Sequence, residues 1–325
     1  MIRKSWIVFL FAIILSCESI LIEYLTLLLG ISPLAISAFS IAISGVLLLL
    51  ILNFVNKRQK PIVFSSIKDF IPASIFLSAG IFTWYDAVSR VGASKESLLA
   101  GPIEIITVLF LARIFLHEKL NKKQLSGICI ALVGFIVVIL SDQNTNDDDD
   151  DNNNNGIMNI TIIAVKSLNF SVSFGDIEAI ISAISFALGV FFLARLSIKY
   201  SPLEISGMCL LLSGFILIIV MLIFTPEVSV NLFLSYWYIF IIFSLLPLIG
   251  TICYVEGIKR IGASLTSTIA SSRILLTLTI QIILTHIGIR NTLPDNVFLA
   301  LIGGMLAMTG IIIIHMHLYF SKHTS

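Results

Sequence analysis

Long apolar runs separated by short polar segments fill most of the chain, and this pattern predicts helices that cross a membrane. A spanning helix needs about 20 predominantly apolar residues. Pro33 and Pro202 each stand at the start of a run, where a missing N–H costs a helix least. We expect an all-α fold with ten transmembrane helices, at residues 6–29, 32–54, 69–90, 95–117, 121–140, 176–198, 202–225, 235–258, 263–286 and 295–319.

The composition narrows the class of protein. Apolar residues make up 58% of the 325 residues and charged residues only 12%, whereas soluble proteins average about 45–50% and about 25%. This excludes a soluble enzyme, a secreted disulfide module and a disordered chain. The net charge of +1 provides no basic surface for nucleic acid. The chain is therefore expected to be a polytopic helical membrane protein.

No catalytic, metal or cofactor motif stands out. The four cysteines lie far apart inside apolar runs, without the spacing of a zinc site. The chain contains no HExxH, GxSxG or P-loop motif. We therefore expect neither an enzyme nor a bound metal or cofactor.

Lysine and arginine are distributed unevenly among the polar segments, which predicts the orientation in the membrane. With the N-terminus in the cytoplasm, fourteen of these residues fall in cytoplasmic segments and four in external ones. Cytoplasmic loops carry such an excess. We expect a cell-membrane protein with both termini in the cytoplasm. The external four are Arg90, Lys95, Lys166 and Arg290.

A polar segment divides the chain at residues 141–175. It contains a run of five aspartates, Asp147 to Asp151, followed by four asparagines. Repeated like charges without apolar residues are typical of disorder. We interpret the segment as an external linker.

The two halves of the chain repeat each other. Three pairs of matching motifs follow in the same order and at a nearly constant separation along the chain. The pairs are Ser32–Ser37 with Ser201–Ser206, Arg90–Ser94 with Arg260–Ser264, and Gly127 and Gly134 with Gly303 and Gly310. The order of these matches predicts an internal duplication, with five-helix repeats at 1–140 and 176–325.

Because five is an odd number, the second copy of a five-span repeat enters the membrane from the side opposite to the first copy. The predicted architecture is thus two inverted five-helix repeats. Such pairs suit alternating access, with the substrate site between the repeats near the middle of the bilayer. This favours a secondary transporter.

The chain resembles the EamA-type domain of the drug/metabolite transporter superfamily. The resemblance rests on Gly92–Ser94 followed by Pro102, on Phe115–Leu120, and on Gln124, Gly127 and Gly134, and it covers roughly 6–140 and 176–319. It implies ten spans in two repeats, with the fourth and ninth spans lining a central cavity. His117 replaces the glycine usual in that family before Glu118, and Arg290 stands where the second repeat would carry a glutamate.

Three ionisable residues in the predicted spans are the candidate substrate-binding residues: Glu18, Glu104 and Arg273. Charged groups inside a membrane are costly and mark functional sites. Glu104 and Arg273 lie at similar depths on the fourth and ninth spans. They could form a structural pair between the repeats, or bind the two ends of a zwitterion. In the second case, Arg273 takes a carboxylate or phosphate, and Glu18 or Glu104 takes an amine or a coupling proton.

Other polar and aromatic residues rank lower as site candidates. Glu23 lies five residues after Glu18, on a different face of the helix and nearer its outer end. Trp84 and Tyr85 fit an interfacial aromatic belt better than a binding cage. Two acid–base pairs, Asp86 with Arg90 and Glu256 with Arg260, are spaced as local i,i+4 ion pairs.

The leading interpretation is a permease that moves small metabolites, such as amino acids or related zwitterions, by alternating access. The alternatives are an exporter of drugs or lipophilic cations, a nucleotide-sugar carrier and, from other classes, an intramembrane enzyme or a channel. The expected partners are a small-molecule substrate, the lipid bilayer and a coupling proton or ion, with a second copy of the chain as a further candidate.

Overall fold

A computed structural model describes residues 2–55, 67–116, 122–141, 173–224, 226–289, 292–294 and 296–321. These residues form helices and turns, without a β-strand among them. The helices of the first half are α1 (Ile2–Leu29), α2 (Pro33–Val55), α3 (Ile67–Val91), α4 (Ala93–Leu116) and α5 (Lys122–Leu140). Those of the second half are α7 (Phe174–Leu196), α8 (Pro202–Phe224), α9 (Pro226–Ile261), α10 (Ala263–Ala270), α11 (Arg273–His286) and α12 (Val297–Ser321).

Each apolar run that the sequence marked as a span is helical, which supports a multi-pass membrane protein. Within the described residues, seven helical stretches are long and apolar enough to cross a membrane. Leu125–Leu140 and Val297–Ile313 are shorter apolar helices. Most of the predicted linker, residues 142–172, lies outside the described residues.

The repeated motifs set the helix boundaries in both halves. Pro33 and Pro202 begin α2 and α8, where proline's fixed φ suits the first turn. Gly92 and Gly262 separate α3 from α4 and α9 from α10, with φ of +84° and +91°. Glycine adopts these angles without the steric cost that a Cβ would add. The same residues thus break the chain at equivalent points.

The predicted span at 263–286 is not one continuous helix. It turns at Ser271 and Ser272, between α10 and α11. The amide of Ser272 donates to the carbonyl of Ile269, an i→i−3 bond of 3.1 Å, and such tight turns inside a helix often mark functional hinges. No proline or glycine lies at this break, so the sequence did not indicate it. The helix α9 contains a second irregular residue, Tyr236, with φ −123° and ψ 18°.

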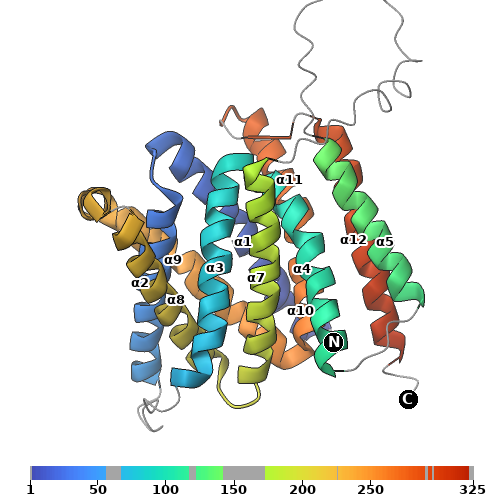
Figure 1. The fold of residues 1–325 in the computed structure, drawn as a ribbon, viewed down its shortest axis with the longest axis horizontal. Helices are drawn as coiled ribbons and strands as arrows, with labels where there is room; N and C mark the ends of the chain where they lie inside the picture. Colours follow the sequence, from blue (N-terminus) through green and yellow to red (C-terminus); the bar gives the residue numbers. More distant parts are fainter. Residues whose placement is uncertain are drawn as a thin grey trace, which may run out of the picture.

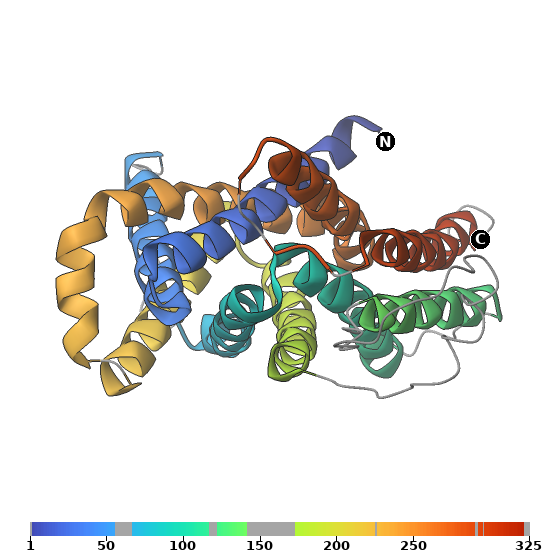
Figure 2. The same ribbon diagram turned by 90° about the horizontal axis from the view of Figure 1, so that it is seen from above.

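The helices pack across the two halves of the chain. The helix α5 lies against α12 at one edge of the molecule, and α2 lies against α8 towards the other (Figures 1 and 2). Between these pairs, α3 packs on α7 and α1 packs on α9, while α4 contacts α7, α10 and α11. The interior is therefore built mainly from contacts between halves.

Glycines allow two of these helix pairs to approach closely. A Cβ on Gly310 of α12 would lie 2.5 Å from the backbone N of Ala131 and from the carbonyl oxygen of Gly127, both on α5. A Cβ on Gly214 of α8 would lie 2.5 Å from Cα of Ala42 on α2. Membrane helices use small residues in this way to bring backbones together.

Candidate functional site

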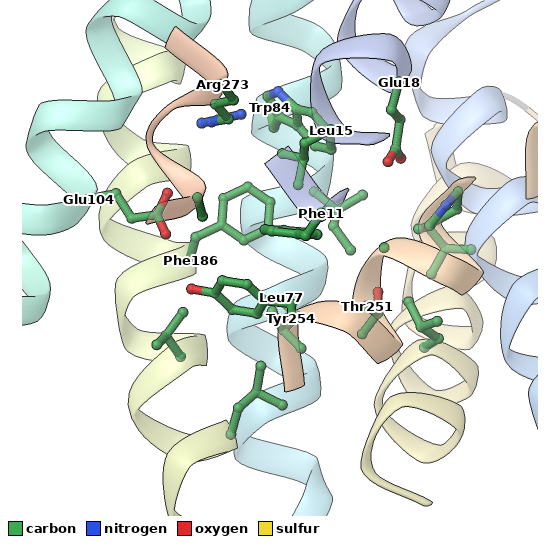
Figure 3. Close-up of a pocket in the computed structure, with 18 of the residues that line it drawn as sticks. Phe11, Leu15, Glu18, Leu77, Trp84, Glu104, Phe186, Thr251, Tyr254 and Arg273 are labelled. Atoms are coloured by element: carbon green, nitrogen blue, oxygen red, sulfur yellow. The ribbon is translucent and has the colours of Figure 1, made fainter. Parts of the chain in front are cut away.

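A mostly apolar cavity lies among helices from both halves of the chain. It encloses about 890 Å³ of space between its lining atoms, its opening included. Ligand sites are concave and mainly apolar, with a few convergent polar groups. The polar members of the lining are Glu18, Glu104, Ser213, Thr251, Tyr254, Ser271 and Arg273, and its aromatic rings are Phe11, Trp84, Phe186 and Tyr254 (Figure 3).

All three candidate residues from the sequence line this cavity. Glu18 comes from α1, Glu104 from α4 and Arg273 from the first turn of α11. Glu18 and Arg273 are each 4% exposed, whereas Glu104 is partly exposed. An acid and a guanidinium from different halves of the chain thus share one cavity (Figure 3).

The ion-pair partner of Arg273 is Glu96, not Glu104. Nη2 of Arg273 lies 3.6 Å from Oε1 of Glu96, and Glu96 is fully buried on α4. The guanidinium also lies 5.8 Å from the ring centroid of Trp84, within cation–π range. Its Nη1 is buried and makes no hydrogen bond to any described residue. Sequence reasoning missed Glu96, although it lies two turns before Glu104 on the same helix.

Glu18 is held by a tyrosine. The hydroxyl of Tyr85 on α3 donates to Oε1 of Glu18 at 2.6 Å, and Tyr85 is fully buried. Trp84 beside it is 4% exposed and lines the cavity. The predicted interfacial belt is therefore wrong for both residues. Their position near a helix end misled the interpretation, because this face of α3 turns into the protein.

Removal of the Tyr85 hydroxyl should destabilise the protein. In Tyr85→Phe the buried Glu18 oxygen loses its donor, which we expect to cost about 1–3 kcal/mol of the free energy of unfolding. Denaturant titration in detergent micelles measures this change. Tyr238→Phe is the matched control, since Tyr238 is 50% exposed. Equal stability of the two variants would contradict the assigned role of the bond.

Glu23 faces a different set of groups from Glu18, as its place on the helix predicted. Its Oε2 accepts from the amide of Ala93 at 2.9 Å and from Nε2 of Gln281 at 2.5 Å. Its Oε1 accepts from the amide and the hydroxyl of Thr292, both at 2.5 Å. We call Glu23, Ala93, Gln281 and Thr292 the Glu23 cluster. It joins α1, the start of α4, α11 and the segment before α12.

Further ion pairs join α7 to its neighbours at the same end of the helices. Lys95 Nζ lies 3.0 Å from Oδ1 of Asp176, and both residues are buried. Arg90 Nε contacts Asp86 at 2.9 Å and Glu178 at 3.1 Å. The local i,i+4 pairs predicted for Asp86 with Arg90, and for Glu256 with Arg260, are both confirmed. Lys95, which the sequence placed in an external segment, thus lies buried inside the helix bundle.

The break between α10 and α11 borders the cavity. Ala270, Ser271 and Arg273 all line it, and the hydroxyl of Ser16 on α1 donates to the carbonyl of Arg273 at 3.4 Å. Ser271 and Ser272 keep right-handed helical φ and ψ, so the chain tightens here without unwinding. Arg273 begins α11 directly after this turn, with its side chain beside the cavity (Figure 3).

Comparisons with known proteins agree with this architecture. Residues 4–140 match the EamA-like transporter family. The uncharacterized transporter YyaM of Bacillus subtilis (strain 168) is 27% identical over 290 residues, which cover 86% of this chain and 84% of that protein. One crystal structure matches with a TM-score of 0.61 and 16% identity, covering 95% of this chain and 96% of its own; this likeness concerns the fold alone. The first half of the chain thus matches the EamA-like transporter family, and the whole chain is similar to a transporter and has the apolar helices of a multi-pass membrane protein.

Proposed function

We propose that this transporter moves a small zwitterionic metabolite of the amino-acid type by alternating access. Ten transmembrane helices in two inverted repeats, 1–140 and 176–325, form the carrier, and the cavity between them is the substrate site. The protein lies in the cell membrane with both termini in the cytoplasm, as the distribution of lysine and arginine predicts.

Close helix contacts support the two-fold relation between the repeats. Gly45 packs against Leu211, and Gly214 packs against Ala42. Exchange of the halves, in the register that matches the two Ser-Pro-Leu motifs, converts the first contact into the second. The contact of Gly134 with Gly303 is related in the same way to that of Gly310 with Gly127, in the register of the repeated glycines.

The contacts between helices are also related in pairs when the two halves of the chain are exchanged. The contact of α3 with α7 corresponds to that of α9 with α1, and the contact of α3 with α8 to that of α9 with α2. The helix α4 and the broken α10 and α11 correspond to each other, and they carry Glu104 and Arg273. Repeats that pack in this way can rock about a site between them.

The proposed substrate class rests on two side chains of opposite charge, Arg273 and Glu104, that line one cavity and have atoms available to bind a ligand. Within the described residues, Nη1 of Arg273 is a buried donor without a hydrogen bond, and the carboxylate of Glu104 makes no ion pair or hydrogen bond. A substrate carboxylate pairs well with the first and an ammonium group with the second. The aromatic and aliphatic lining accommodates an apolar side chain.

Ligand-induced stabilisation tests the substrate class. Leucine carries both charged groups, its methyl ester keeps only the ammonium group, and 4-methylpentanoate keeps only the carboxylate. A ligand that binds the folded protein raises its apparent stability by mass action. We expect leucine to raise the melting temperature most, and Glu104→Gln to weaken its apparent affinity by roughly tenfold or more. Glu256→Gln, whose ion-pair partner Arg260 lies on its own helix, should leave the response unchanged.

A lipophilic cation is the second candidate, because Arg273 already contacts Glu96. The cavity would then present Glu18 and Glu104 among aromatic rings, which attract cations. Stabilisation by the ester as strong as that by leucine would favour this candidate. Uptake of labelled leucine into proteoliposomes, driven by a proton gradient, then tests transport and the coupling ion.

A further inference from the structure

We propose that the Glu23 cluster is the latch that closes the cavity at one face of the membrane. The proposal rests on alternating access as the proposed function, and it names the groups that must separate when the carrier opens towards that face. We call this the Glu23 face, at the C-terminal end of α1.

Three helices place the cluster on the same side of the cavity. On α1, Glu23 lies more than one helical turn beyond the cavity residue Glu18, towards the C-terminal end. On α11, Gln281 lies more than two turns beyond Arg273, again towards the C-terminal end. On α4, Ala93 precedes Glu104 by about three turns in a helix of opposite direction. The cluster therefore separates the cavity from one end of all three helices.

Burial places three of the four members of the cluster inside the protein at this end. Glu23 is 2% exposed, and Ala93 and Gln281 are fully buried, whereas Thr292, at the outer side of the cluster, is exposed. Nearby, the Lys95–Asp176 pair joins α4 to α7.

Glu23 joins parts of the chain that belong to opposite halves. Its carboxylate receives the amide of Ala93 from the first half, and the amide and hydroxyl of Thr292 from the second. Opening this end must remove some of these donors from the carboxylate. Because hydrogen bonds to a charged acceptor are about twice as strong as neutral ones, Glu23 biases the carrier towards closure at this face.

The geometry makes Glu23→Gln a sharp test. Donors occupy both oxygens of the carboxylate. Whichever way the amide of glutamine lies, its NH₂ group faces the backbone N–H of Ala93 or of Thr292, and two donors cannot bond to each other. The side chain keeps its size while the latch weakens. Thr292→Val removes only the hydroxyl donor and serves as a milder variant.

The rate at which a reagent reaches the cavity from each face of the membrane measures whether the latch is closed, and it requires no ligand. We would replace the four native cysteines, introduce Thr251→Cys into the cavity lining, and label sealed vesicles of both orientations with a membrane-impermeant maleimide. We expect Glu23→Gln to raise the labelling rate from the Glu23 face by roughly tenfold and to lower it from the other face. Thr292→Val should raise it by roughly threefold, and Glu256→Gln should leave both rates unchanged.

The outcomes separate the latch from the proposed function. If the Thr292→Val variant folds and its labelling rates from both faces equal those of the parent, the latch proposal is wrong. This holds whether or not the Glu23→Gln variant folds. Faster labelling from the Glu23 face supports it, even where leucine fails to protect Thr251→Cys. That failure counts against the substrate class alone.

Discussion

Replacement of Arg273 by methionine should destabilise the protein by about 3–5 kcal/mol, because Glu96 would remain as a buried charge without its partner. Glu96 is fully buried, and it also accepts a hydrogen bond from the hydroxyl of Ser97 at 3.3 Å. Denaturant titration in micelles measures the loss. A change below about 1 kcal/mol would show that Glu96 is neutralised in another way.

The double variant Arg273→Met with Glu96→Gln separates stability from ligand binding. The large penalty of breaking a buried ion pair comes from the one charge that is left uncompensated, and it disappears when both charges are removed. We therefore expect the double variant to recover most of the stability that Arg273→Met loses, with a favourable coupling of about 0.5–3 kcal/mol in the double-mutant cycle. Its response to leucine should stay lost, because no guanidinium remains to bind the carboxylate.

This pair of variants also decides between two roles of Arg273. If the recovered double variant still responds to leucine, Arg273 only neutralises Glu96, and the substrate carboxylate binds elsewhere. If stability returns without the response, Arg273 binds the ligand. A single substitution of Arg273 cannot distinguish lost binding from lost folding, since Glu96 links the two.

The pattern of apolar runs was sufficient to predict the helices, because membrane-spanning helices depend mainly on local composition. It was insufficient for the turn at Ser271 and Ser272. Serine is compatible with a continuous helix, so only the packing around the cavity reveals the break. The repeated glycines indicated the duplication, and the contact of Gly310 with the backbone of α5 adds a role in helix packing that the sequence did not show.

For the site, the sequence indicated the rare charges but not their partners. Glu18, Glu104 and Arg273 stood out as ionisable residues inside apolar runs, and they line one cavity; substrate binding by them stays a prediction. Arg273 meets Glu96, and Glu23 meets Thr292, although the members of each pair lie in opposite halves of the chain. Such pairs depend on how helices cross, and two of the four bonds to Glu23 come from backbone amides that no side-chain pattern reveals.

Gly310→Ala should destabilise the contact between α5 and α12, although alanine is the better helix former. A new Cβ would lie 2.5 Å from the backbone of α5 at both Ala131 and Gly127. Backbone atoms cannot rotate away, so the two helices must separate. Overpacking of this kind typically costs about 1–3 kcal/mol, and Gly310→Leu should cost more and reduce the yield of monodisperse protein.

Gly250→Ala is the matched control for this prediction. Gly250 also lies inside a helix, but a Cβ there would meet only side-chain atoms, the nearest being Cγ2 of Ile14 at 3.4 Å. Alanine should then gain up to about 1 kcal/mol from helix propensity. A lower free energy of unfolding for Gly310→Ala and a higher one for Gly250→Ala, both measured by denaturant titration, would show that close backbone approach, rather than flexibility, requires glycine at position 310. Because exchange of the repeats relates Gly310 to Gly134, Gly134→Ala should reproduce the loss, and an unaffected Gly134→Ala would contradict the two-fold relation at this contact.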